Sequence, residues 1–146
     1  MKRQSTNPSS VNENPKQPIL ENLITNFSNE KFDYVFKEVN KLLSDYPKSY
    51  KLWNILGAIN TQIHKTQDAM QCYEKAIELR PDYAEAHNNL GNLFQNEGEH
   101  EKAIVSYEKA LEIKPELYEA IYNLGAIFQE RENYVLAVQN YLKVLD

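Results

Sequence analysis

The chain has 146 residues, 42% of them hydrophobic and 25% charged, which is enough apolar material for one folded domain and argues against global disorder. Its 16 basic and 21 acidic residues leave a net charge of −5, which argues against nucleic acid or an anionic membrane as the main partner. The single cysteine, Cys72, allows no intrachain disulfide, and the sequence shows no bilayer-spanning apolar run and no secretory signal, so we expect a cytoplasmic protein.

The chain begins with a polar, proline-punctuated stretch over residues 1–16, which we expect to be a disordered tail. Residues 17–49 then form a predicted helix pair that diverges from the units after it. In this pair Asn22 and Leu23 stand where the later units carry leucine and glycine. A divergent terminal repeat is typical of a cap, since one of its faces has no neighbour.

Three regular units follow, and one period of 34 residues runs through them, set by Gly57, Gly91 and Gly125. Each unit carries the three-then-four apolar spacing of an amphipathic helix twice, and a proline ends the second helix of the first two units. The units span residues 50–83, 84–117 and 118–146, and the period is kept by Leu56, Leu90 and Leu124, by Ala69, Ala103 and Ala137, by Tyr73, Tyr107 and Tyr141, and by Pro47, Pro81 and Pro115.

The repeated glycines indicate close packing inside each unit. A glycine in the middle of a helix costs about 1 kcal/mol relative to alanine, so three at one register suggest a packing requirement. We expect Gly57 and Ala69 to let the two helices of a unit approach closely, and Ala76 to do the same against the next unit. The sequence therefore predicts an all-α protein.

A specific pattern of residue types recurs in these units, and in the first of them it consists of Trp53, Leu56, Gly57, Ala69, Tyr73, Ala76 and Pro81. This pattern and its period resemble the tetratricopeptide repeat family. The resemblance implies a right-handed superhelical solenoid of antiparallel helix pairs, with about four units, the first degenerate and the last truncated. It also implies a non-catalytic interaction module whose successive first helices line a concave groove for an extended peptide or a partner helix.

The predicted groove face carries an unusual number of amides. Asn88, Asn92 and Asn96 are four residues apart on one helix, and an amide can pair with a peptide backbone as donor and as acceptor. If these amides bind a partner, replacing Asn89, Asn92 and Asn123 by alanine should weaken binding and leave folding intact; the alternative is that they are solvated surface residues. The full predicted partner-binding set is Asn54, Asn88, Asn89, Asn92, Gln95, Asn96, Tyr122, Asn123, Gln129 and Glu130.

Two more specific resemblances bear on function. The run AHNNLGNLFQNEG is similar to the repeats ahead of the catalytic region of O-linked N-acetylglucosamine transferases, where asparagines at the place of Asn89 and Asn123 hold substrate backbone, although Ile55 breaks the series here. This leaves an alternative function as the substrate-presenting or regulatory arm of a larger glycosyl- or sulfotransferase. A carboxylate clamp for C-terminal peptide tails is rejected, because only Asn89 fits its pattern and Glu119 would repel a carboxylate.

The sequence shows no residue pattern for a metal site or for catalysis. His64, His87 and His100 are too far apart for a metal site, Cys72 has no ligand partner at a suitable spacing, and His87 occupies the core register of Trp53. We therefore expect no enzyme activity, no cofactor and no metal, and a protein or peptide partner rather than nucleic acid or a membrane.

The C-terminal edge is the last sequence feature of note. Asp146 falls inside the expected second helix of the last unit, so either the chain was cut from a longer protein or another molecule covers this edge. Self-association through the uncapped helix is possible, along an apolar stripe of Val138, Tyr141, Leu142 and Leu145.

Overall fold

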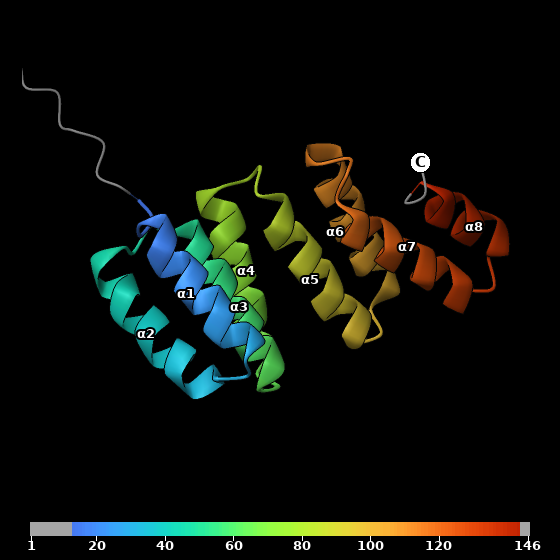
Figure 1. Cartoon of the computed structure of the whole chain (residues 1–146). Helices are drawn as coiled ribbons and strands as arrows, with labels where there is room; N and C mark the ends of the chain where they lie inside the picture. Colours follow the sequence, from blue (N-terminus) through green and yellow to red (C-terminus); the bar gives the residue numbers. More distant parts are fainter. Residues whose placement is uncertain (1–12, 144–146) are drawn as a thin grey trace, which may run out of the picture.

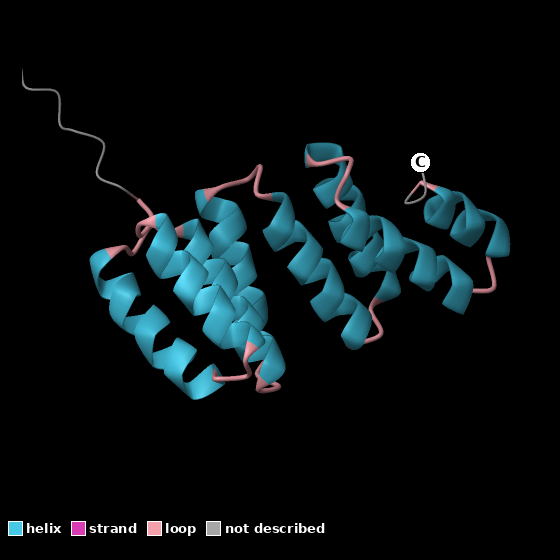
Figure 2. Cartoon of the chain, in the orientation of Figure 1, coloured by secondary structure: helices cyan, strands magenta, loops and turns pink. Residues whose placement is uncertain are grey.

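A computed structural model describes residues 13–143, and these residues form eight α-helices and no strand (Figures 1 and 2). The predicted all-α repeat fold is confirmed. In chain order the helices are α1 (Gln17–Ser28), α2 (Phe32–Asp45), α3 (Tyr50–Gln62), α4 (Thr66–Leu79), α5 (Ala84–Asn96), α6 (His100–Ile113), α7 (Tyr118–Glu130) and α8 (Tyr134–Leu142).

The helices stack as four pairs in a row, from α1 and α2 at one end to α7 and α8 at the other (Figure 1). The most extensive contacts lie within the α3–α4, α5–α6 and α7–α8 pairs, and each second helix also packs on the first helix of the next pair. The first helices α3, α5 and α7 additionally contact one another in series. These contacts place the first helices side by side along one face.

Each repeated glycine faces a tyrosine of the second helix of its own unit. A Cβ atom on Gly57 would lie 2.6 Å from Cε1 of Tyr73, and one on Gly91 would lie 2.7 Å from Cδ1 of Tyr107. The tyrosine ring therefore occupies the space that a side chain at the glycine would need. The sequence predicts a close approach at this register, but the residue that fills it is the tyrosine and not the alanine.

The turn inside each unit repeats as well. Glu30, His64, Gly98 and Glu132 are spaced 34 residues apart, and all four have a positive φ, between 58° and 75°. This left-handed conformation is free of strain only for glycine. Three of the four turns therefore hold a residue that the conformation disfavours.

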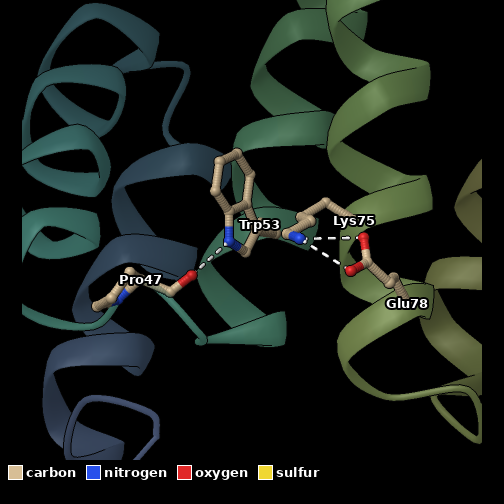
Figure 3. Close-up of polar contacts among 4 residues, drawn as sticks. All are labelled: Pro47, Trp53, Lys75 and Glu78. Atoms are coloured by element: carbon tan, nitrogen blue, oxygen red, sulfur yellow. Dashed lines mark hydrogen bonds and ion pairs between the residues drawn. The ribbon is translucent and has the colours of Figure 1, made fainter.

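A side-chain hydrogen bond ties the proline turn to the following first helix in two units. Trp53 Nε1 donates to the carbonyl oxygen of Pro47 at 3.0 Å (Figure 3), and His87 Nε2 lies 2.9 Å from the carbonyl oxygen of Pro81. Both ring side chains are half-buried, so His87 takes over the place and the contact of Trp53.

The first pair packs on α3 through buried Leu20, Leu23 and Val39, which belong to one apolar cluster with α3. Of the expected polar tail, residues 1–12 lie outside the described part of the chain. The residues directly before α1 are in contact with the chain just ahead of α3: Pro15 is buried, and Oγ of Ser49, the N-cap residue of α3, donates to Asn14 Oδ1 at 2.8 Å.

Candidate functional site

A cavity of about 370 Å³ opens between the first helices of the four units. Residues from α1, α3 and α5 form its walls, and the start of α7 closes one side. Because no second helix contributes to it, the cavity belongs to the face along which the first helices lie side by side.

The end of the cavity near α1 is apolar. Leu20, Ile24 and Phe27 of α1 face Ile55 and Ala58 of α3 across it. Ile24 is 52% exposed although it is a large aliphatic side chain, because it borders this cavity and not the core. The apolar side chains of α1 divide in two: Leu20 is buried in the core, whereas Ile24 stays open to the cavity.

The middle of the cavity is lined by amides. Asn89 Nδ2 of α5 donates to Asn54 Oδ1 of α3 at 3.0 Å, which joins two neighbouring units. Asn88 is only 2% exposed, and its Oδ1 has no hydrogen-bond partner among the described residues. A buried acceptor without a donor costs free energy, which a bound donor group would recover.

A second group of amides joins α5 to α7. Asn92 Oδ1 accepts from Tyr107 Oη and from Asn123 Nδ2, both at 2.7 Å, and Asn92 Nδ2 donates to Glu119 Oε1 at 3.1 Å. Tyr107 Oη also lies 2.8 Å from Gln95 Oε1. Burial and the charge of Glu119 raise the pKa of Tyr107, so its hydroxyl remains a neutral donor. These amides hold neighbouring units together in the free chain.

The three asparagines four residues apart on α5 lie in three different environments. Asn88 is almost fully buried, Asn92 is half-buried and bonded within the chain, and Asn96 is exposed at the end of α5. The reason is that α5 lies between α3 and α7, so the burial of a side chain depends on its position along the helix axis as well as on the helix face that carries it.

Charged side chains surround the cavity. Lys51, Glu85 and Glu119 lie on its wall and occupy the same register in three successive units. Glu85 Oε1 lies 3.1 Å from Lys114 Nζ, and Glu119 accepts from Asn92. The wall therefore presents both signs of charge to a ligand.

Other predicted site residues lie away from this cavity. Tyr122 is 60% exposed on α7 and packs on Tyr141, with ring centroids 5.5 Å apart. Gln129 Oε1 accepts from Tyr141 Oη at 3.1 Å, and Glu130 Oε2 lies 3.5 Å from His100 Nε2. Along with Asn92, Gln95, Asn96 and Asn123, these residues are absent from the cavity wall, so only Asn54, Asn88 and Asn89 of the predicted set line it.

The cavity also has residues that the predicted set omits. Tyr83 and Leu117 precede α5 and α7, and both lie on its wall. Burial is the largest cause that raises the pKa of Tyr83 to about 12, and its ring packs edge-on against Tyr50 at 4.8 Å. The repeat register could have indicated Lys51 and Glu85, because both fall on positions that face inward; Tyr83 and Leu117 fall just before the helices and carry no such signal.

Residues 13–143 hold no group of three or more His, Cys, Asp or Glu side chains placed to bind a metal ion. In the same part of the chain, every helix is too short or too polar to cross a membrane.

Comparison with known proteins gives two family models and several relatives. A model described as tetratricopeptide repeat matches residues 84–117, and one described as TPR repeat matches residues 61–98. A peroxisomal targeting signal receptor of Candida albicans is 39% identical over 65 residues, which are 44% of this chain and 11% of the receptor. Tetratricopeptide repeat protein 37 of Xenopus laevis is 29% identical over 77 residues, which are 53% of this chain and 5% of that protein.

Among solved structures, a crystal structure of MamA superimposes with a TM-score of 0.76 at 29% identity, over 87% of this chain and 74% of the other. The chain spans only about a tenth of the length of the curated relatives it matches.

Proposed function

We propose, from the tetratricopeptide repeats that the chain carries, that it is a non-catalytic protein-interaction module which binds an extended segment of a partner protein in the cavity between its first helices. The observation that carries the proposal is that cavity itself, walled by α1, α3, α5 and the start of α7 and lined by Asn54, Asn88 and Asn89. Repeat arrays create extended concave surfaces in this way.

The cavity suits a peptide in two respects. Its amides can donate to and accept from a backbone whatever the partner's side chains are, and the unpartnered Oδ1 of Asn88 would take a backbone N–H. Its apolar end, with Ile24, Ile55 and Ala58, would take one aliphatic or aromatic side chain of the partner. An extended segment supplies both groups at once.

The charges on the wall exclude a simple preference for carboxylates. Glu85 and Glu119 flank the amides, and Lys51 is a single cation on the same wall. Glu85 is paired with Lys114, so Lys51 and Glu119 leave no net positive charge for a free C-terminal carboxylate, and we propose an internal segment of a partner over a C-terminal tail.

The test is selection of binders from a random dodecapeptide library displayed on phage, followed by calorimetric titration of the selected peptides. Ala58→Arg would place a long side chain in the cavity, and we expect it to weaken binding by about tenfold or more, equivalent to losing roughly 1.4 kcal/mol. Gln67→Arg, on the exposed side of α4, is the matched control and should bind as the unchanged chain does. Unchanged affinity in a folded Ala58→Arg variant would place the ligand elsewhere.

The three relatives described above are named as a receptor, a repeat protein and MamA, and none is named as a transferase. The alternative function, as an arm of a glycosyl- or sulfotransferase, therefore gains no support. The absence of enzyme activity and the cytoplasmic location remain predictions from the sequence.

A further inference from the structure

The outer face of α8 is unusually apolar for a solvent-facing surface. Val135 is 69% exposed, Leu136 37% and Leu142 53%. These three side chains lie on a helix whose core residues are Ala137 and Asn140. They are therefore not needed to hold α8 against α7.

The corresponding residues of the two preceding second helices are polar. The positions of Val135, Leu136 and Leu142 correspond to Gln67, Asp68 and Glu74 in α4, and to Glu101, Lys102 and Glu108 in α6. All of these residues are exposed. Both helices are followed by another unit, and these positions stay exposed there. A unit after α8 would leave the three apolar side chains exposed in the same way.

The predicted apolar stripe of this helix thus consists of two different faces. Val138, 54% exposed, corresponds to Met70, which packs in the apolar cluster that joins α4 to α5. Tyr141, which is partly exposed, corresponds to Tyr73 of the same cluster, so these two residues lie on the face that meets a following unit. Leu142 belongs to the other, outer face, and Leu145 lies outside the described residues.

A cleft of about 930 Å³ adjoins the outer face, between α6, α7 and α8. Leu136 and Leu142 form one wall, and Leu111 and Phe128 are among the apolar residues opposite. The space is large enough to receive side chains of a second molecule.

A buried acceptor without a donor lines the same cleft. Asn140 is 5% exposed; its Nδ2 donates to the carbonyl oxygen of Leu136 at 2.9 Å, and its Oδ1 has no partner among residues 13–143. At the same register, Cys72 accepts from Asn60 and Ser106 donates to the backbone of its own helix. Only in α8 is this position left with an unpaired acceptor beside an open cleft, within the described helices.

The charges on the two rims of the cleft are opposite. Glu108 and Glu112 lie on the α6 rim, and Lys143 lies on the α8 rim. A two-fold axis that runs along the cleft sets the α6 rim of one copy against the α8 rim of the other. Each Lys143 would then face Glu108 and a Glu112 that also pairs with Lys109 of its own helix, and the apolar face of one α8 would meet the apolar cleft of its counterpart.

We propose that this outer face of α8 and its cleft bind a second copy of the same chain in an isologous dimer. A surface can pair with itself only if it is self-complementary about a two-fold axis, and a cleft with acidic and basic rims fulfils that condition. The exposed amide of Gln139 on the same face offers a donor for Asn140 Oδ1 of the other copy. The concave cavity between the first helices stays open in this dimer, so the inference is independent of the proposed peptide binding.

The first test uses the residues of α4 as a template. The variant Val135→Gln/Leu136→Asp/Leu142→Glu gives α8 the outer face that α4 has at the same register, which the repeat fold tolerates. Sedimentation velocity over a concentration series should show a monomer–dimer equilibrium for the unchanged chain, weakened about 100-fold or more in the variant. Tyr34→Asp, an exposed residue at the register of Leu136 in α2, is the control and should leave the dimer intact.

The second test exchanges the rim charges. Lys143→Glu and, separately, Glu108→Lys/Glu112→Lys should each dimerise more weakly, because like charges then face each other across the axis. A mixture of the two variants should restore association as a heterodimer, because opposite charges then face each other at both rim contacts. Circular dichroism of each variant confirms that it is folded.

Three results would overturn the inference. They are a strict monomer at about millimolar concentration of the unchanged chain, full association in the folded triple variant, and a charge-exchanged mixture that associates no better than its components. Association lost in Val138→Lys but kept in the triple variant would place the contact on the face that meets a following unit, and would equally contradict it.

Discussion

Gly91 and Gly125 occupy equivalent positions in two units, so the same substitution, Gly→Ala, can be compared at the two sites. A Cβ atom would lie 2.7 Å from the nearest tyrosine carbon at both positions, from Tyr107 in one case and Tyr141 in the other. The two rings differ in freedom: Tyr107 is fully buried and hydrogen-bonded to Asn92, whereas Tyr141 is partly exposed and its hydrogen bond to Gln129 lies at the surface. Gly→Ala should therefore have opposite effects at the two sites.

At Gly91 three contributions add up. Alanine gains about 1 kcal/mol over glycine in a helix, overpacking against the immobile ring costs about 1–3 kcal/mol, and a displaced hydroxyl would lose about 0.5–1.5 kcal/mol. Together they amount to a loss of about 0.5–3.5 kcal/mol, so we expect Gly91→Ala to lower the free energy of unfolding by about 2 kcal/mol. At Gly125 the ring of Tyr141 can turn towards solvent, so we expect Gly125→Ala to be neutral or to stabilise by up to about 1 kcal/mol.

Urea titration followed by the helical circular dichroism signal measures this difference, and a thermal melt should show Gly91→Ala lower by roughly 2–6 °C. If Gly91→Ala is as stable as the unchanged chain, or if Gly125→Ala is the more damaging of the two, then burial of the tyrosine ring does not control the need for glycine.

Three further outcomes follow from the turns, the buried thiol and phenol, and the amide network. His64→Gly should raise the free energy of unfolding by up to about 1 kcal/mol in urea, because it relieves a left-handed backbone at φ 59°, and the reverse change Gly98→Ala should lower it by about 1–2 kcal/mol. Burial raises the pKa of the Cys72 thiol from 9.0 to about 11 and that of Tyr73 from 10.0 to about 12. The stability that these two groups contribute in their protonated form is therefore complete below about pH 9 and is lost as pH rises to about 12. Urea midpoints measured from about pH 8 to 12 should fall, and a flat profile would contradict this. Asn92→Ala should destabilise by about 1–3 kcal/mol in the same titration, because it leaves Asn123 Nδ2 without its acceptor and Tyr107 Oη with Gln95 Oε1 alone, and an unchanged midpoint would mean that the amide bridges contribute nothing.

The register of the helices could be predicted from the sequence because it depends on local spacing. The recurrence of glycine, alanine and proline every 34 residues implies helix pairs, and the observed helices start at Tyr50, Ala84 and Tyr118. The sequence also predicts that Asn54 faces the groove, and Asn54 lies on the cavity wall.

The pairing of the amides could not be predicted in the same way. Asn92 meets Asn123 across 31 residues of chain, and that meeting depends on the rotation between neighbouring units, which residue spacing does not encode. The sequence predicts that alanine at Asn89, Asn92 and Asn123 leaves folding intact. The hydrogen bonds within the chain now predict a loss of stability, so binding and folding effects of these substitutions must be measured separately.

The contacts between helices are almost entirely between neighbours along the chain, since each helix packs chiefly on the one before and the one after it and the first helices touch only in series. Native contacts therefore close short loops, and chains with mostly local contacts fold in microseconds to milliseconds. Folding can start in any unit and spread to its neighbours, and within residues 13–143 the outer pairs α1–α2 and α7–α8 each pack on one other pair and should open more readily than the inner pairs, which pack on two. Amide hydrogen exchange should accordingly be slowest in α4 and α5 and faster towards α1 and α8. A partner that contacts α1, α3 and α5 together would slow the opening of the N-terminal units and leave the opening of α8 unchanged.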